Sequence, residues 1–286
     1  MGMANLKSTS QGITNFTSHT KPLVLIQTAL DSLTSRERRV AEYILAQPHA
    51  IMNLSIGQLA RLSATSESTV VRFCKKLGFE GYPHLKLVLA KNHTELTSNV
   101  YPTVHRSDSV ANLVEKTFQY AMQALQDTVC VLSPVALEKG AEALLRANKV
   151  VLAGVGGSGA AAEMAVQKLL RLGIHGHVCS DMSIMPLIAG TLHPDDVALG
   201  ISHRGRTEGV EEFLDIAQHR GATTMAIVSD VQSPVAHKAD IVLQSVCPES
   251  PLGPEAGSAR VAQITVIDAL CLAAAVKIGD HEERRG

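Results

Sequence analysis

The sequence has few aromatic residues, no tryptophan and almost no net charge. Aromatic residues make up 3% of the 286 residues, so the core must consist mainly of Leu, Val, Ala and Ile. With a formal net charge of −1, the chain as a whole does not indicate a polyanionic partner. Its length leaves room for two modest domains.

Cysteines are also few, and their spacing argues against a metal site. There is no C-x-x-C pair and no cysteine–histidine pair at zinc spacing among Cys74, Cys130, Cys179, Cys247 and Cys271. We therefore expect reduced cysteines, no metal and no cofactor. Residues 1–20 contain no apolar signal segment, and no apolar run approaches the roughly 20 residues that span a membrane. The expected location is the cytoplasm, without membrane contact.

The small net charge hides an uneven distribution. Residues 1–93 contain eleven Lys and Arg residues against five Asp and Glu residues, and the remainder contains fifteen against twenty-two. A basic first part favours a nucleic-acid partner there, although this signal is weak by itself.

Hydrophobic periodicity divides the chain into a helical part and a part that alternates strands with helices. We predict a disordered arm over 1–20, a helical domain over 21–93, a linker over 94–109 and a second domain over 110–280. In the first domain, helices are expected over 35–47, 55–62, 66–77 and 82–93. In the second, helices over 110–129 and 134–147 precede the strands, and a long apolar helix covers 258–278. The strands are expected over 150–153, 177–179, 196–201, 224–228 and 241–243. Strands separated by helices predict a doubly wound, parallel, five-stranded α/β sheet.

The third predicted helix has the features of a recognition helix. Val70, Phe73, Cys74 and Leu77 form one apolar stripe, and Ser66 is placed to cap the N-terminus. A short helix, a tight turn and a second helix with a polar tip are typical of a helix-turn-helix that enters the major groove. The predicted DNA-facing residues are Ser66, Glu67, Ser68, Thr69, Arg72, Lys75 and Lys76. A solvated basic face on a dimerisation module is the alternative.

Two segments of this domain carry a family resemblance. Residues 66–82, SESTVVRFCKKLGFEGY, and residues 35–44, SRERRVAEYI, resemble the N-terminal domain of RpiR-type bacterial transcriptional regulators. The resemblance covers about residues 30–93 and implies binding to a double-stranded DNA operator.

Two loops in the second part have the composition of anion-binding sites. Residues 154–159, GVGGSG, follow the first strand, and residues 202–207, SHRGRT, follow the third. Each precedes a helix, and helix N-termini favour negative charge. Gly154, Gly156 and Gly159 also fit G-x-G-x-x-G, with Asp181 placed for a ribose, so a dinucleotide is the alternative ligand. A sugar monophosphate would use both loops, with Arg204 and Arg206 adding positive charge.

This pair of loops resembles the SIS (sugar isomerase) domain, which forms the effector half of RpiR-type regulators. The resemblance covers about 110–278 and implies that Ser158, Ser202 and Thr207 are phosphate-binding hydroxyls. The family's second loop usually reads S-x-S-G-x-T, and here Arg204 stands at the second serine. Its guanidinium could grip phosphate or a sugar carboxylate, or project into solvent. The full set of predicted ligand residues is Gly156, Gly157, Ser158, Asp181, Ser202, His203, Arg204, Gly205, Thr207 and Glu255.

Two roles are open for Asp181 and one for Glu255. Asp181 either binds sugar hydroxyls or caps the following helix, and Glu255 is the one plausible general base of a catalytic SIS domain. No histidine has a partner visible from spacing, and a fused DNA-binding domain gives ligand binding a use without turnover. We therefore predict a non-enzymatic regulator, by family precedent a repressor, that forms a dimer or tetramer and senses a phosphosugar. An SIS-type phosphosugar isomerase is the alternative.

Overall fold

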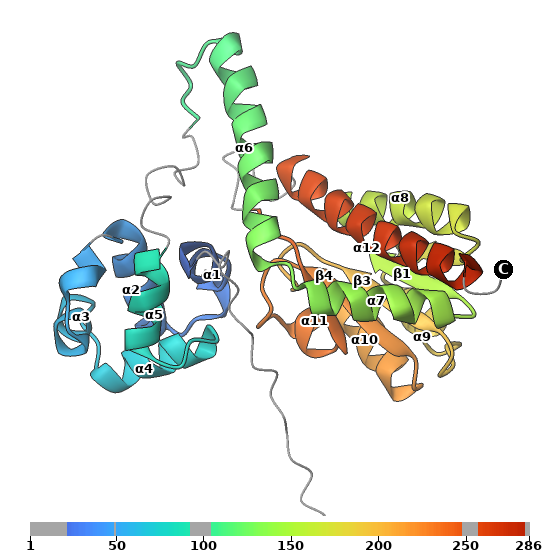
Figure 1. The fold of residues 1–286 in the computed structure, drawn as a ribbon, viewed down its shortest axis with the longest axis horizontal. Helices are drawn as coiled ribbons and strands as arrows, with labels where there is room; N and C mark the ends of the chain where they lie inside the picture. The colour runs from blue at the N-terminus through green and yellow to red at the C-terminus, as the bar shows by residue number, and fades with distance from the viewer. Residues whose placement is uncertain (1–21, 49, 92–103, 248–256, 284–286) are drawn as a thin grey trace, which may run out of the picture.

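The computed structural model describes residues 22–48, 50–91, 104–247 and 257–283. They form a helical body and an α/β body, with the long helix α6 (Val110–Val131) between them in the view of Figure 1. The predicted arm over 1–20 and part of the predicted linker lie outside the described residues. The helical and α/β fold classes expected from the sequence are both confirmed.

The helical body contains five α-helices and two short 3₁₀ turns among the described residues. They are α1 (Pro22–Thr28), η1 (Leu30–Ser32), α2 (Ser35–Ala46), η2 (Ala50–Asn53), α3 (Ile56–Leu62), α4 (Glu67–Lys76) and α5 (Tyr82–Lys91). Their apolar faces enclose one core, in which Ile44, Leu59, Val70, Phe73 and Leu85 are fully buried. The predicted stripe on the third helix is confirmed, although Leu77 is only partly covered.

The connection between α3 and α4 is the turn of a helix-turn-helix. The Ser63 hydroxyl donates to the Leu59 carbonyl, and Thr65 N–H donates to the Ala60 carbonyl. Ala64 takes φ +50°, in the left-handed region that residues with a side chain rarely adopt. Ser66 then caps α4 by accepting from Thr69 N–H, as its sequence position predicted.

The α/β body is built on one parallel sheet of five strands. They are β1 (Val150–Gly154), β2 (Gly176–Cys179), β3 (Val197–Ile201), β4 (Thr223–Val228) and β5 (Ile241–Gln244), in the order β2-β1-β3-β4-β5. In register, Val150 pairs with Val197 and Val197 with Thr223. The observed strands lie within one residue of the predicted bounds at each end.

Helices cover both faces of the sheet because alternate strand residues point to opposite sides. One face carries α7 (Pro134–Arg146), α8 (Gly157–Arg171) and α12 (Gly257–Glu283) over Leu152, Leu199 and Ile227. The other carries α9 (Met185–Ala189), α10 (Glu208–His219) and α11 (Pro234–His237) over Ala153 and Ala198. Figure 1 shows α8 and α12 together on one side and α9, α10 and α11 on the other.

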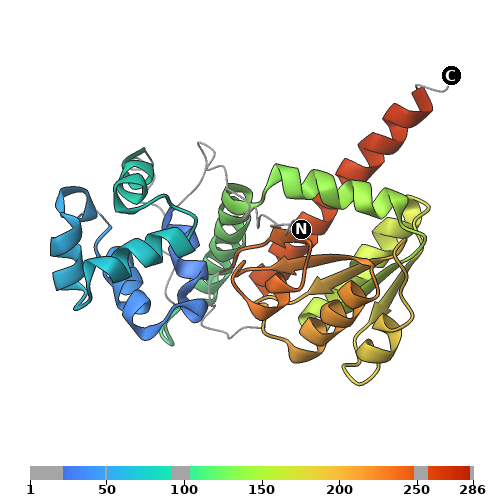
Figure 2. The same ribbon diagram turned by 90° about the horizontal axis from the view of Figure 1, so that it is seen from below.

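The last helix corrects one expectation from the sequence. Residues 257–279 of α12 are long and apolar enough to cross a membrane, contrary to our statement that no run approaches that length. Their apolarity has another explanation, because Val266, Ile267, Leu270 and Ala274 are buried in the core against α7, α8 and the sheet. Figure 2 shows the C-terminal end of α12 projecting beyond this core.

Candidate functional site

Parallel pairing brings both predicted anion loops to one edge of the sheet. Residues 154–159 follow β1 and residues 202–207 follow β3, and these two strands are neighbours. The chain leaves β1 for β2 on one side and returns to β3 on the other, which makes this edge a topological switch point. Ligands of open α/β sheets bind at such a position.

The first loop depends on close backbone packing. Gly156 has φ +57°, and a Cβ at Gly154 would lie 2.7 Å from the Ser158 carbonyl oxygen. A Cβ at Gly159 would lie 2.8 Å from the Ser180 hydroxyl, so the turn after β2 rests on the start of α8. This packing places the buried Ser158 side chain in the first turn of α8.

The second loop is closed by its own hydroxyl groups. Ser202 Oγ lies 2.9 Å from Thr207 Oγ1, and Gly205 N–H donates to the Ser202 carbonyl at 3.1 Å. Gly205 has φ +66° and packs directly on the buried Ser233. Ser202 and Thr207 therefore lie together, as the resemblance implies for phosphate-binding groups.

The helices that follow these loops, like α9, lack the side-chain cap that other helices carry. In α2, α3, α4, α6 and α7 a Ser or Thr hydroxyl accepts from the backbone N–H three residues on. In α8 the N-cap is Gly156, and in α10 it is Thr207, whose side chain makes no capping hydrogen bond. Both helices therefore present N-terminal N–H groups without a side-chain cap, the arrangement that accepts an anion.

Two residues of α12 complete the first loop, and the sequence prediction did not include them. Arg260 Nη1 donates to Ser158 Oγ at 2.6 Å and to Gln263 Oε1 at 2.7 Å. Gln263 is fully buried, and the Arg260 side chain occupies the space that a Cβ at Gly157 would need. The signal available in the sequence was an arginine and a glutamine close together in an apolar helix.

Positive charge surrounds the histidine of the second loop. Burial, and then the charges of Arg260 and Arg204, lower the pKa of His203 to about 4. His203 is therefore neutral at neutral pH, and it can accept a hydrogen bond as well as donate one. A bound anion would oppose the effect of both guanidinium groups.

Three other predicted residues do not contribute to the site as described: two make contacts away from it, and one lies outside the described residues. Asp181 is exposed, and its Oδ1 accepts from Ser183 N–H at 2.9 Å and from the Ser183 hydroxyl at 2.7 Å. These bonds hold the Asp181 pKa below its usual range and order the turn after β2. The N-cap of α9 is Ile184, so Asp181 does not cap that helix. Glu255 lies outside the described residues. Arg206 does not add its charge to the loop, since its Nη2 donates to the Asp31 carbonyl of the helical body.

On the recognition helix, two of the seven predicted residues are placed differently. Thr69 is buried, and its hydroxyl lies 2.9 Å from Ser66 Oγ, so it does not face solvent as predicted. Lys76 Nζ donates to the Ser32 carbonyl at 2.5 Å and lies 3.5 Å from a Glu37 carboxylate oxygen. The exposed members of the set are Ser66, Glu67, Ser68, Arg72 and Lys75.

Among the described residues, no three His, Cys, Asp or Glu side chains form a group that could hold a metal ion. All five cysteines are free thiols. The chemistry that the site offers is hydrogen bonding from hydroxyls, guanidinium groups and helix N-termini to an anion.

Two family models match the chain. Residues 20–95 match the helix-turn-helix domain of the rpiR family, and residues 143–273 match the SIS domain. A helix-turn-helix transcriptional regulator of Caldanaerobacter subterraneus is 35% identical over 258 residues, covering 90% of this chain and 92% of the relative. The regulator HexR of Escherichia coli is 33% identical, covering 86% of this chain and 84% of the relative.

Solved structures share the same fold. The Vibrio vulnificus NanR protein, complexed with ManNAc-6P, aligns with a TM-score of 0.58 at 24% identity, covering 92% of this chain and 94% of NanR. The sugar isomerase domain of an RpiR transcription factor from Sphaerobacter thermophilus aligns with a TM-score of 0.54 at 29% identity, covering 58% of this chain and 91% of that one. The chain therefore belongs to the RpiR family of helix-turn-helix transcriptional regulators, and its second half is an SIS domain.

Proposed function

We propose that the chain is a repressor whose affinity for its operator changes when a phosphorylated sugar or sugar derivative binds its SIS domain. The observation that carries this proposal is the pair of helix N-termini without side-chain caps, α8 and α10, at adjacent strand ends. The division we propose is a DNA-binding domain over 21–93, a linker over 94–109 and an effector domain over 110–280. Such a regulator works in the cytoplasm, where its DNA lies.

The phosphate sits between the two loops. Ser158, Ser202 and Thr207 donate their hydroxyl protons, and Gly156, Gly157 and Gly205 let the backbone approach. Arg260 adds a charge-assisted hydrogen bond, since its guanidinium already contacts Ser158. His203, Arg204, Asp181 and Glu255 are assigned to the rest of the ligand, with Arg204 suited to a second anionic group.

DNA recognition rests on the exposed start of α4. Ser68 and Arg72 reach base edges in the major groove, while Lys75 contacts a phosphate. Ser66 and Glu67 lie beside Ser68 at the same end of α4 and contact the DNA there. Lys76 makes internal contacts, and we assign it a supporting role beside the interface.

A second copy of the chain covers the exposed side of α6. Val110, Val114, Phe118 and Met122 recur at intervals of four residues, and each is more than half exposed. An apolar stripe of this kind is typical of an interface. Leu272 and Val276 of α12 are exposed in the same way. We propose that these helices join two copies and set the spacing of two recognition helices for a palindromic operator.

Ligand binding without turnover accounts for the fused DNA-binding domain. The curated relatives named above are regulators, whereas isomerases also have the SIS fold. The structure of the described residues offers His203 as a neutral base, but its burial and cationic surroundings suit ligand binding as well.

The test is binding of the purified protein to duplex DNA from its own upstream region, at fixed salt, with and without a panel of sugar phosphates. Competitor-resistant binding that one sugar phosphate weakens supports a phosphosugar-responsive repressor. Binding that the ligand strengthens would mean that the phosphosugar promotes operator binding instead of releasing it. If genome-wide fragment selection also yields no bound DNA while the protein converts a sugar phosphate, we would conclude that it is an SIS-type isomerase.

A further inference from the structure

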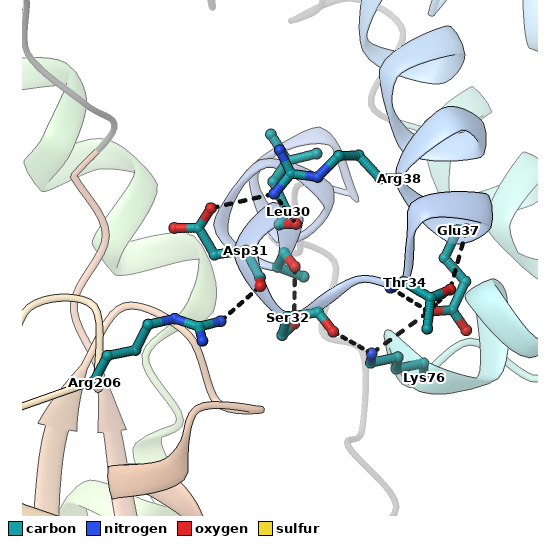
Figure 3. A network of polar contacts seen from close by, with 9 residues as sticks. Leu30, Asp31, Ser32, Thr34, Glu37, Arg38, Lys76 and Arg206 are labelled. Atoms are coloured by element: carbon teal, nitrogen blue, oxygen red, sulfur yellow. Dashed lines mark hydrogen bonds and ion pairs between the residues drawn. The ribbon is translucent and has the colours of Figure 1, made fainter. Parts of the chain in front are cut away.

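One short turn of the DNA-binding domain receives cations from three elements. The turn is η1, whose three carbonyls each accept from a different side chain (Figure 3). Arg38 Nη2 donates to the Leu30 carbonyl at 2.8 Å, Arg206 Nη2 to the Asp31 carbonyl at 2.6 Å, and Lys76 Nζ to the Ser32 carbonyl at 2.5 Å. Carbonyls at the end of a helical turn lack internal partners and carry partial negative charge, which explains why they attract cations.

These three cations come from functionally different places. Arg38 belongs to α2, and Lys76 is the last residue of α4, the recognition helix. Arg206 belongs to the other domain, between Gly205 and Thr207 of the second anion loop. The turn therefore lies between the effector loop and the recognition helix, with a direct hydrogen bond to each.

A buried carboxyl marks the same junction. Asp230 follows β4, and Gln232 N–H donates to its Oδ1 at 2.8 Å. Its Oδ2 is buried and makes no hydrogen bond with any described residue. Burial raises the pKa of Asp230, while the hydrogen bond from Gln232 N–H and the charges of Arg206 and Lys76 act in the opposite direction. The junction thus places an acidic side chain of the SIS domain near cations from both domains.

Arg206 is adjacent to a hydrogen bond of the anion loop that a bound phosphate would change. Ser202 and Thr207 have one hydroxyl proton each, and their mutual hydrogen bond uses one of them. Donation of both protons to a phosphate requires this bond to break, because the shared proton must turn from the neighbouring oxygen to the phosphate. Arg206 is the adjacent residue, and its side chain spans the gap to Asp31.

We propose that Arg206 is the positioning residue that couples the effector site to the recognition helix through the Leu30–Ser32 turn. Phosphate in the loop draws Thr207 and Arg206 toward the site, the Asp31 contact breaks, and the DNA-binding domain is released from its docked position. The coupling rests on the proposed phosphate site, whereas the docking role of Arg206 does not.

The docking role is tested on the full-length chain without ligand, by hydrogen–deuterium exchange. Arg206→Ala is expected to raise exchange of the Ser32 and Leu33 amides about tenfold, the low end for loss of a charge-assisted hydrogen bond. Arg206→Lys should give an intermediate rise. The matched control is Arg220→Ala, because Arg220 is also exposed and its Nε donates to the Leu192 carbonyl within the SIS domain. Unchanged exchange at residues 30–34 in Arg206→Ala would overturn the proposal.

The coupling is tested with inorganic phosphate as the probe, against sodium chloride at matched ionic strength. In the wild type, phosphate should protect residues 154–159 and 202–207 and raise exchange at 30–34. In Arg206→Ala, phosphate should still protect the two loops. Residues 30–34 already exchange rapidly in this variant, so phosphate should not raise their exchange further. Protected loops with no wild-type change at 30–34 would refute the coupling and leave the phosphate site standing. Loops that phosphate does not protect would refute the proposed site itself, and with it the coupling.

Discussion

Two helices of this protein begin at a hydroxyl residue, yet their first turns differ. In α4 the Ser66 hydroxyl accepts from Thr69 N–H and closes the N-terminus. In α10 the Thr207 hydroxyl turns away from its own helix and meets Ser202 at 2.9 Å. The residues beside each cap, Thr65 and Glu67 for α4 and Arg206 and Glu208 for α10, do not predict this difference.

This difference in capping determines which helix end can receive an anion. A capped helix has used one of its N-terminal N–H groups, so α4 contacts its polyanion through exposed side chains along its surface. An uncapped helix leaves its N–H groups for the ligand itself. We therefore expect substitutions in the two first turns to have opposite consequences.

The largest expected effect concerns the backbone of the α10 loop. A Cβ at Gly205 would lie 1.9 Å from Ser233 Oγ, at φ +66°. Gly205→Ala should therefore destabilise the SIS domain by about 4 kcal/mol, from positive-φ strain and overpacking together. Chemical unfolding followed by circular dichroism measures this loss. Gly173→Ala is the control, because Gly173 has φ +73° but open space around it, and it should cost only about 1 kcal/mol. Equal costs would show that the loop tolerates a side chain as the α3–α4 turn tolerates Ala64.

The next effect is a loss of folding stability at acidic pH, caused by His203 in the loop before α10. The pKa of His203 falls from 6.5 to about 4 in the folded protein, because of burial and then the charges of Arg260 and Arg204. The unfolded chain therefore binds a proton first as the pH drops, and stability is lost between pH 6.5 and pH 4. The loss attributable to His203 is about 3 kcal/mol. It is measured as the difference between wild type and His203→Asn across this range, and added phosphate should reduce it. If the stability of both proteins fell equally between pH 6.5 and pH 4, the loss could not be assigned to His203.

The third effect separates the two anion-binding regions by function. Ser202→Ala with Thr207→Ala should weaken binding of the effector about 100-fold, because two hydrogen bonds to a charged group are lost. The same double change should leave specific DNA affinity intact. Arg72→Ala should do the reverse, with about a tenfold loss of DNA affinity. Calorimetry and fluorescence anisotropy measure the two affinities. The control is Thr191→Ala, since the Thr191 hydroxyl bonds locally to the Ile188 carbonyl. Loss of both activities in either folded variant would argue against a modular protein.

The smallest effect compares the two first turns directly. Ser66→Ala removes a cap and should destabilise the DNA-binding domain by about 1 kcal/mol, whereas Ser66→Asp should be nearly neutral. Thr207→Asp supplies a carboxylate at an N-terminus without a cap and should stabilise α10 by about 0.5 kcal/mol. It should also abolish phosphate binding, since the new charge occupies the anion's place. Thermal unfolding measures the stabilities, and a destabilised Thr207→Asp would show that α10 is already closed.

Most of the architecture could be predicted because it follows from local patterns. The stripe of Val70, Phe73 and Cys74 repeats at helical spacing, and each of the five strands is a short apolar run between helices. Ser66 lies directly before its helix, so its capping role could be inferred from position alone. Resemblance added the family, which the relatives and family models confirm.

Several side chains could not be placed from the sequence because their partners are distant along the chain. Thr69 is covered by the packing of α4 on the core, and Lys76 reaches back 44 residues to Ser32. Arg260 reaches Ser158 across 102 residues, and Arg206 reaches Asp31 across 175. Spacing carries no information about such pairs.

Three features follow from local sequence: the two fold classes, the order of the elements and the two glycine-containing loops. Hydrophobic period and backbone freedom, on which they depend, are properties of neighbouring residues. The packing of distant segments sets which hydroxyls meet at the anion site, which cations surround His203 and which arginine of the 202–207 loop turns toward the DNA-binding domain. Those outcomes depend on what a folded neighbour offers as a hydrogen-bond acceptor, and only the assembled sheet and helices bring that neighbour within reach.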